Sequence, residues 1–397
     1  MLLNVKKIWW YLIIFVLLIV FATYFILIPK TVHIYIDYAT TPTLLQMIDM
    51  VKQNPEEEKI VVWRRMRNLN KELLSKKYNA HEIYLDTDSD EYKSPENLIT
   101  IVESIHHLIK KNNNTSYVIH ANLDHIETLI PLLQLVPISL IEHIHLYEDS
   151  IGKTVLMADA KSIERKKLEE AVKQFEGIDK NYYRYNLHKI YPVTYHLAFK
   201  HYIENFPTMH NFRMVVPTDL INDVSIHKIA KSLTDVEKQK LSELLDVNIE
   251  DFNKENNIAV FALGYLGDIQ GNKAQIELLR FIKQSVKEKN YTWFYKEHPW
   301  LTNDTYLKNT INKEFPDMKE IRKDIPLEVF IILGGKSFKF AGYSSSIFMS
   351  VPPKDIIYYI RRPKDVYLPF LFEQNIVSPK QVINIVDYIR EINDVQK

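Results

Sequence analysis

The chain has 397 residues, of which 46% are apolar, and its 50 basic side chains balance its 50 acidic ones. This apolar content excludes a disordered chain and suffices for the cores of two ordinary domains. The zero net charge argues against a polyanionic partner, so we expect no nucleic-acid binding. Because the chain has no cysteine, disulfides, thiolate metal sites and thiol nucleophiles are excluded.

Glycine is scarce, with only 8 residues in the chain. The glycine-rich fingerprints of Walker-type ATPases and dinucleotide enzymes are absent, so both classes are excluded on motif grounds. Six of the glycines lie after residue 262, three of them between residues 264 and 271. Since glycine lets the backbone approach other groups closely, this distribution points to a ligand-binding loop in the C-terminal half.

The first predicted element is a membrane anchor. Residues 8–28 form 21 consecutive positions without a charge, and as a helix they would span about 31 Å, which matches a hydrocarbon core of about 30 Å. We therefore expect residues 1–30 to anchor the chain. Lys6 and Lys7 precede the segment and Lys30 follows it, a weak bias that favours a cytoplasmic N-terminus.

From Val32 onward the sequence alternates short apolar strands with helix-period segments, as in parallel sheets covered by helices. A polar stretch at residues 253–257 precedes a new strand, Ile258 to Ala262, where the alternation restarts. We expect an α/β protein with two Rossmann-like domains facing a cleft, residues 31–255 and 256–377. A C-terminal helix, residues 378–397, is expected to pack back on the first domain. Ligands in such folds lie beyond the carboxyl ends of the strands.

Glu148 and Asp149 follow one predicted strand directly. Two adjacent carboxylates raise the pKa of one of them, as a general base requires. The competing interpretation of such a pair is a turn or the start of a helix.

His298 is the second candidate, because it follows another predicted strand together with Lys296 and Pro299. Histidine can donate a proton to a leaving phosphate, lysine can pair with its charge, and proline fixes the turn. The competing interpretation is an inert loop histidine. A third candidate is the serine run Ser344 to Ser346, because hydroxyls and backbone N–H groups at a helix start bind anions.

Two metal-like patterns are weaker. The acidic run at residues 86–90 resembles a calcium loop, but Glu91 and Asn97 stand where that loop needs glycine and glutamate. An acidic loop is the preferred interpretation. His143 and His145 share one strand face without an identifiable third ligand, so a packed or edge pair is expected.

Seven segments, in this order, resemble motifs of the bacterial sialyltransferases of glycosyltransferase family 80. The similarity is collinear over most of residues 32–360. The segments are IYIDYATTPTL at 34–44, IHANLDH at 119–125, LYEDS at 146–150, YPVTYH at 191–196, YKEHP at 295–299, PLEV at 326–329 and SSIFMS at 345–350.

The resemblance implies a GT-B fold and an inverting sialyltransferase that takes sialic acid from CMP-sialic acid, without a metal or other cofactor. It implies a galactoside acceptor on a surface glycan such as lipooligosaccharide. Asp149 would be the general base and His298 would assist the departing CMP phosphate. The other implied site residues are Lys296, Pro299, Glu328, Ser345 and Ser346 around the donor nucleotide, and Asn122 and His125 on the acceptor and sialyl side.

Three positions depart from the family pattern: Ser150 and Glu297 replace glycines, and Ile269 replaces a tryptophan. Two alternatives therefore stay open, a transferase of another CMP-activated acid sugar such as Kdo, and a non-catalytic glycan- or nucleotide-binding protein. We expect a single-pass protein of the bacterial inner membrane. The side of the catalytic domain is left open, because the donor is made inside the cell whereas the charge bias points the body outward.

Overall fold

The structure, a computed structural model, describes most of both α/β regions. The described residues are 14–16, 30–37, 40–63, 69–83, 95–109, 115–122, 136, 140–147, 213–215, 225–248, 250–264, 269–298, 305–334, 338–343, 345–361, 365, 368–373 and 375–388.

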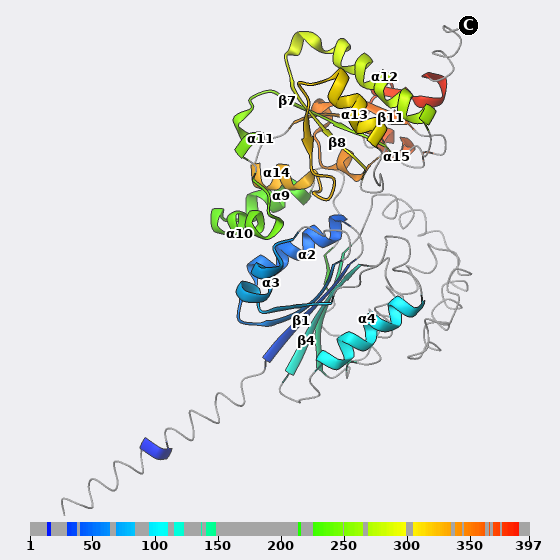
Figure 1. Ribbon diagram of the computed structural model, residues 1–397. Helices are drawn as coiled ribbons and strands as arrows, with labels where there is room; N and C mark the ends of the chain where they lie inside the picture. The colour runs from blue at the N-terminus through cyan, green and yellow to red at the C-terminus, as the bar shows by residue number, and fades with distance from the viewer. Residues whose placement is uncertain are drawn as a thin grey trace, which may run out of the picture.

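Six parallel strands form the first sheet, in the order β3-β2-β1-β4-β5-β6. Helices α2 and α4 cover opposite faces of this sheet (Figure 1). Because both faces are covered, β1 is buried continuously from Val32 to Asp37 instead of alternating. The bounds are β1 Lys30–Asp37, α2 Thr40–Lys52, β2 Glu58–Trp63, α3 Lys71–Tyr78, β3 Ala80–Glu82, α4 Pro95–Leu108, β4 Thr115–Asn122, β5 Ile141–Tyr147 and β6 Arg213–Val215.

The second sheet repeats this arrangement, with six parallel strands in the order β12-β11-β10-β7-β8-β9. Its bounds are β7 Ile258–Ala262, α12 Ile269–Ser285, η7 Lys287–Lys289, β8 Thr292–Lys296, α13 Thr305–Glu314, β9 Lys319–Ile321, α14 Glu328–Gly334, β10 Lys339–Tyr343, η8 Ser346–Met349, η9 Pro353–Asp355, β11 Ile356–Arg361, α15 Leu368–Glu373, η10 Pro379–Gln381 and β12 Val382–Asn384.

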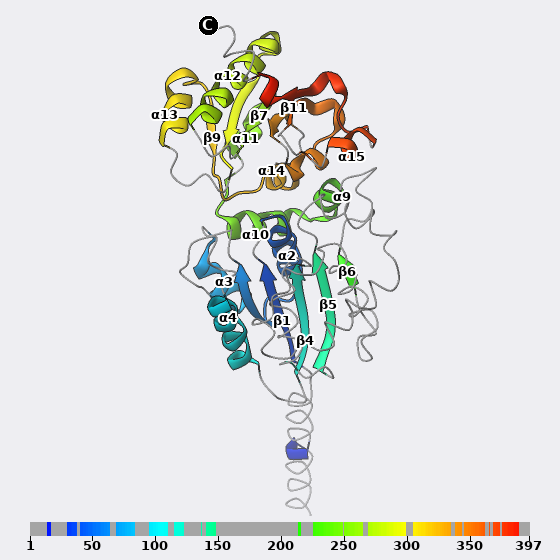
Figure 2. The ribbon, with the colours of Figure 1, turned by 90° about the vertical axis from the view of Figure 1, so that its right-hand side faces the viewer.

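In each sheet the strand order reverses between the first and fourth strands, at β1/β4 and at β7/β10. Such switch points, at the carboxyl ends of the strands, are where open α/β sheets bind ligands. In the first sheet the carboxyl ends of β1, β4 and β5 point toward the second sheet (Figure 2).

Three helices connect the two sheets: α9 Ser225–Ser232, α10 Asp235–Leu245 and α11 Glu250–Lys254. Helix α10 packs against α2 of the first domain, and α9 packs against α14 of the second (Figure 2). Leu241 and Leu244 on α10 are fully buried in an apolar cluster that also contains Leu44 and Phe330. The two sheets therefore share one core through this helical segment.

Hydrogen bonds reinforce the connection at the end of α10. The backbone N–H of Asn70 donates to the carbonyl of Leu244 at 3.0 Å, and the Arg322 guanidinium donates to the carbonyl of Asp246 at 2.8 Å. The C-terminal carbonyls of α10, which have no partner within the helix, are thus held by groups from both domains.

The C-terminal segment differs from the prediction of a helix from residue 378. Residues 379–381 form η10, and β12 then pairs in parallel with β11 of the second sheet. Ile385 is buried in the core of the second domain. Here β-sheet pairing overrides the helical spacing of the apolar residues. The packing of residues 389–397 lies outside the described residues.

The predicted anchor, residues 8–28, lies outside the described residues except for residues 14–16, which are helical and exposed. Among the residues that the structure describes, no helix is both long and apolar enough to cross a membrane.

Candidate active site

The carboxyl ends of three strands meet at the switch point of the second sheet. Ala262 on β7 pairs with Lys296 on β8 and with Gly342 on β10. The backbone N–H of Leu263 donates to the carbonyl of Lys296 at 2.9 Å, which extends the pairing beyond the end of β7. The residues that follow β8 and β10, including His298 and Ser345, therefore emerge at one edge of the sheet.

Two glycines at this edge are required by packing within the protein. A Cβ at Gly264 would lie 2.7 Å from the Tyr343 ring, and one at Gly342 would lie 2.8 Å from the Cβ of Ala262. The predicted role of glycine in a ligand-binding loop does not apply to these two, because their close neighbour is the protein itself. They let β7 and β10 and the segments after them approach closely.

A buried pair of opposite charges lies at the same edge. Lys296 is only 9% exposed, and its Nζ donates to the carbonyl of Lys323 at 3.0 Å. Burial lowers the pKa of Lys296 to about 8, against the attraction of Glu328 and other carboxylates. Glu328, the first residue of α14, is 4% exposed, and burial raises its pKa against a backbone hydrogen bond and the charge of Lys296. The structure thus brings these two predicted donor-site residues together.

His298 and Ser345 lie on the segments that leave this edge. His298 is half-buried two residues after β8. Ser345 is exposed at the cap position of η8, and its hydroxyl makes no capping hydrogen bond. That hydroxyl is therefore not used to cap the helix. Ser346 opens η8, but its side chain and all of Pro299 lie outside the described residues.

In the first domain the structure shows the strand ends that precede the predicted base. Asn122, the last residue of β4, is in register with Tyr147, the last residue of β5. Asp149, His125 and the side chain of Asn122 lie outside the described residues, as does the acidic run at 86–90.

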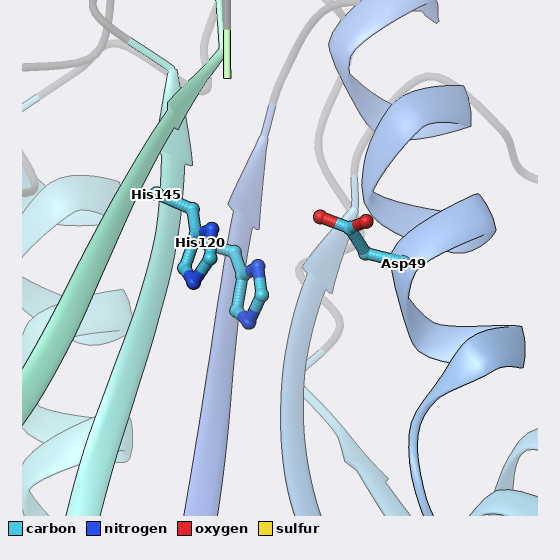
Figure 3. A group of neighbouring side chains, drawn as sticks. All are labelled: Asp49, His120 and His145. Atoms are coloured by element: carbon cyan, nitrogen blue, oxygen red, sulfur yellow. The ribbon is translucent and has the colours of Figure 1, made fainter. Parts of the chain in front are cut away.

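Just before the ends of β4 and β5, the structure reveals a polar cluster that sequence reasoning missed (Figure 3). The Tyr147 hydroxyl donates a hydrogen bond to the carboxylate of Asp49 on α2. Nδ1 of His120 on β4 lies 3.0 Å from the same hydroxyl, and Nε2 of His120 lies 3.0 Å from Nδ1 of His33 on β1. His33, His120 and Tyr147 are buried, with exposed fractions of 4%, 0% and 0%.

Aromatic rings stack across the sheet at the same level. The His120 ring lies between Tyr35, at a centroid distance of 4.1 Å, and His145, at 4.7 Å. His145 therefore stacks on His120 of the neighbouring strand. This contact could not be predicted from the sequence of β5 alone. The side chain of His143 lies outside the described residues.

Asp49, His120 and His145 offer potential metal-ligand atoms within 4.8 Å of one another. Both ring nitrogens of His120 already take part in hydrogen bonds, with Tyr147 and with His33. A cation would have to displace one of these partners, so the arrangement favours a hydrogen-bonded network over a metal centre.

Gln46 holds the switch point of the first sheet. It is fully buried, and its Nε2 donates to the carboxylate of Asp37 at 3.2 Å and to the carbonyl of Ile36 at 3.1 Å. The indole N–H of Trp63 donates to Oε1 of Gln46 at 2.8 Å. One side chain of α2 thus secures the ends of β1 and β2.

Two parallel sheets with matching switch points, joined by packed helices, define the GT-B class of glycosyltransferase folds. Three solved sialyltransferases share this fold. The α/β-galactoside α-2,3-sialyltransferase of Photobacterium phosphoreum has a TM-score of 0.65 at 17% identity, over 90% of this chain and 99% of its own. The enzyme of Photobacterium damsela has a TM-score of 0.66 at 18% identity, over 89% of this chain and 81% of its own.

The third is a 2,6-sialyltransferase of another Photobacterium species, in a ternary complex with CMP and lactose, with a TM-score of 0.65 at 16% identity over 89% of this chain and 78% of its own. The family model described as Sialyltransferase PMO188 matches residues 32–365. The chain therefore belongs to this family of sialyltransferases, and the resemblance inferred from its ordered motifs is confirmed. No curated protein matches it by sequence.

Proposed function

We propose that this sialyltransferase moves sialic acid from CMP-sialic acid to a terminal galactoside hydroxyl, with inversion and without a metal ion. The observation that carries the proposal is the edge of the second sheet, where Lys296 and Glu328 are buried together and His298 and Ser345 emerge beside them. The similar Photobacterium enzyme that binds CMP and lactose supports the choice of donor and acceptor class.

The donor side is assigned by chemistry. A buried carboxylate at Glu328 suits the ribose hydroxyls, and the ammonium of Lys296 suits the anionic nucleotide. His298, Ser345 and Ser346 donate to the phosphate as CMP departs, while Pro299 fixes the turn. Since CMP leaves as a monophosphate, these donors can offset the developing charge without a divalent ion.

The acceptor side belongs to the first domain. Asp149 removes the proton of the acceptor hydroxyl, and Asn122 and His125 lie on the acceptor and sialyl side. In this proposal residues 31–255 bind the acceptor, residues 256–377 bind the nucleotide, and the substrates meet in the cleft between them.

Residues 8–28 anchor the enzyme in the bacterial inner membrane, where a surface glycan such as lipooligosaccharide would be its acceptor. The support is the uncharged run of 21 residues and its length as a helix, about 31 Å.

The substitution Asp149→Ala tests the catalytic assignment. Loss of a general base lowers kcat by about 10²–10⁴-fold, while CMP affinity, measured by calorimetry, stays unchanged because CMP binds the other domain. Glu148→Ala, the adjacent carboxylate, is the matched control and retains most of the rate. Transfer at the wild-type rate by Asp149→Ala would remove this residue from the mechanism.

A further inference from the structure

We propose that Asp49, Tyr147, His120 and His33 form a positioning relay that fixes the end of β5, and with it the carboxylate of Asp149. The inference rests on the proposed function, in which Asp149 is the general base. None of the four residues belongs to the predicted site. Each is a positioning residue, because it acts through β5, whose last residue precedes Asp149 by two positions.

The relay ties three strands and a helix together at one level. Asp49 lies on α2, His33 on β1, His120 on β4 and Tyr147 on β5. The hydroxyl of Tyr147, the last residue of β5, is the point where the link from α2 and the link from β4 meet. Any shift of the β5 end relative to α2 or β4 would therefore break a hydrogen bond of a buried hydroxyl, which is unfavourable.

The direction of donation is set by the Tyr147 hydroxyl at the Asp49 end of the relay and by the tautomers of His120 and His33 at its other links. Because the Tyr147 hydroxyl donates to Asp49, its oxygen accepts from Nδ1–H of His120. In the tautomer with its proton on Nδ1, His120 accepts at Nε2 from Nδ1–H of His33, 3.0 Å away. With these tautomers the three links are filled by three protons, and both histidines are neutral.

Burial and nearby charges keep His33 neutral at neutral pH. Burial, together with the smaller effects of Lys59 and His145, lowers the pKa of His33 to about 4. Glu57 faces the other nitrogen, with its carboxylate 3.3 Å from Nε2 of His33. His33 is therefore neutral at neutral pH, and a further proton would enter only on acidification, between His33 and Glu57.

Asp149 follows Tyr147 by two residues, so its Cα lies within roughly 7 Å of the anchored residue. A base must lie within hydrogen-bond reach of the proton that it removes, and a misplacement of about 1 Å can lower the rate by about 100-fold. Anchoring the last residue of the strand is therefore an effective way to place the carboxylate two residues later.

The test compares Tyr147→Phe with Tyr78→Phe. Tyr78 is a fully buried tyrosine of the same domain, and its hydroxyl has no partner among the residues described. We expect Tyr147→Phe to lower kcat by about 10- to 100-fold and to leave the KM for CMP-sialic acid within twofold of wild type. Tyr78→Phe keeps the wild-type kcat.

A second pair separates positioning from loss of stability. Asp49→Asn keeps an oxygen that accepts from the Tyr147 hydroxyl, so it retains most of the rate. Asp49→Leu removes the acceptor and behaves like Tyr147→Phe. Because Asp49 is only half-buried, both variants remain testable if Tyr147→Phe does not fold.

Wild-type kcat in Tyr147→Phe or in Asp49→Leu would overturn the relay, as would an equal loss in Asp49→Asn and Asp49→Leu. Failure of the proposed function looks different, because the unmodified enzyme would then transfer no sialic acid, or Asp149→Ala would transfer it at the full rate.

Discussion

Glu328 and Lys296 are buried opposite charges, an arrangement that is costly unless a ligand or hydrogen bonds compensate it. The raised pKa of Glu328 and the lowered pKa of Lys296 share burial as their main cause. Perturbed pairs of this kind cluster at functional sites. We therefore propose that the nucleotide supplies the compensating contacts at this edge.

Glu328→Gln tests that account. Replacing the carboxylate removes charge-assisted hydrogen bonds worth about 1.5–3 kcal/mol, so CMP affinity falls by about 10- to 100-fold. Calorimetric titration with CMP measures the loss. Glu320→Gln is the matched control in the same domain, because the Glu320 carboxylate pairs at 2.6 Å with Lys308 on the surface. Equal CMP affinity in wild type and Glu328→Gln would exclude Glu328 from the nucleotide site.

The pKa of His33 makes stability depend on pH in a defined direction. Its folded value of about 4 lies below the ordinary value of 6.5, so between these values the unfolded chain binds a proton that the folded chain does not. The unfolding free energy therefore falls as pH drops from 6.5 to 4, and by pH 5 this group accounts for about 2 kcal/mol.

Urea unfolding of wild type and His33→Asn at pH 7 and pH 5 measures this contribution. Asparagine keeps a donor for Nε2 of His120 but has no titrating group. The unfolding free energy of the His33→Asn variant should therefore fall by about 2 kcal/mol less than that of wild type between pH 7 and pH 5. An identical loss in both proteins would show that His33 does not titrate below its ordinary range on folding.

Some of the site residues could be predicted from the sequence and others could not, for a physical reason. His298, Lys296 and the serine run can be found from sequence because Lys296 ends a strand and the others follow a strand within a few residues. The relay joins Asp49, His120 and Tyr147, which are far apart in the chain. Only the register of β4 against β5 and the packing of α2 bring them together.

The helical segment between the sheets packs against both domains and contributes side chains to their shared core, in addition to linking them. Helix α10 begins with a capping box formed by Thr234 and Glu237 and buries Leu241, Leu244 and Leu245. The capping box stabilises the N-terminus of α10, and its apolar face packs against both domains. Helix α10 contacts α2, which carries Asp49 of the relay, and α14, whose first residue is Glu328.

Leu244→Ala should destabilise the protein by about 2–5 kcal/mol, because it removes a fully buried side chain at this shared core. Urea unfolding measures the change. Val236→Ala on the same helix is the control, since Val236 is 62% exposed and its truncation should stay within about 0.5 kcal/mol. Equal stability of Leu244→Ala and wild type would show that α10 does not hold the domains together.

Element types were predictable where apolar periodicity agreed with the tertiary environment. The strand predicted over residues 258–262 is β7, and the restart of alternation there is the start of the second sheet. The prediction of a C-terminal helix was wrong for its first residues, because Val382 and Ile383 belong to β12 at the edge of that sheet. Spacing alone does not tell a helix face from an edge strand when a sheet offers free hydrogen-bonding groups.

For the whole molecule, alternation of strands and helices predicted two parallel-sheet domains, and both are present. Strand order could not be obtained in this way, because it depends on which faces the crossover helices cover. The matching order places a switch point in each sheet, and the shared core fixes the two sheets together through α9 and α10. This is a geometry suited to bringing a donor on one domain to an acceptor on the other.

The most direct test is the reaction of the unmodified protein with CMP-sialic acid and lactose, in buffer containing EDTA, followed by mass spectrometry and linkage analysis of the product. Our account predicts sialyllactose and CMP in equal amounts, at a rate that EDTA does not change. Binding of CMP without sialyllactose, transfer only from CMP-Kdo, or a rate abolished by EDTA and restored by a divalent ion would contradict it.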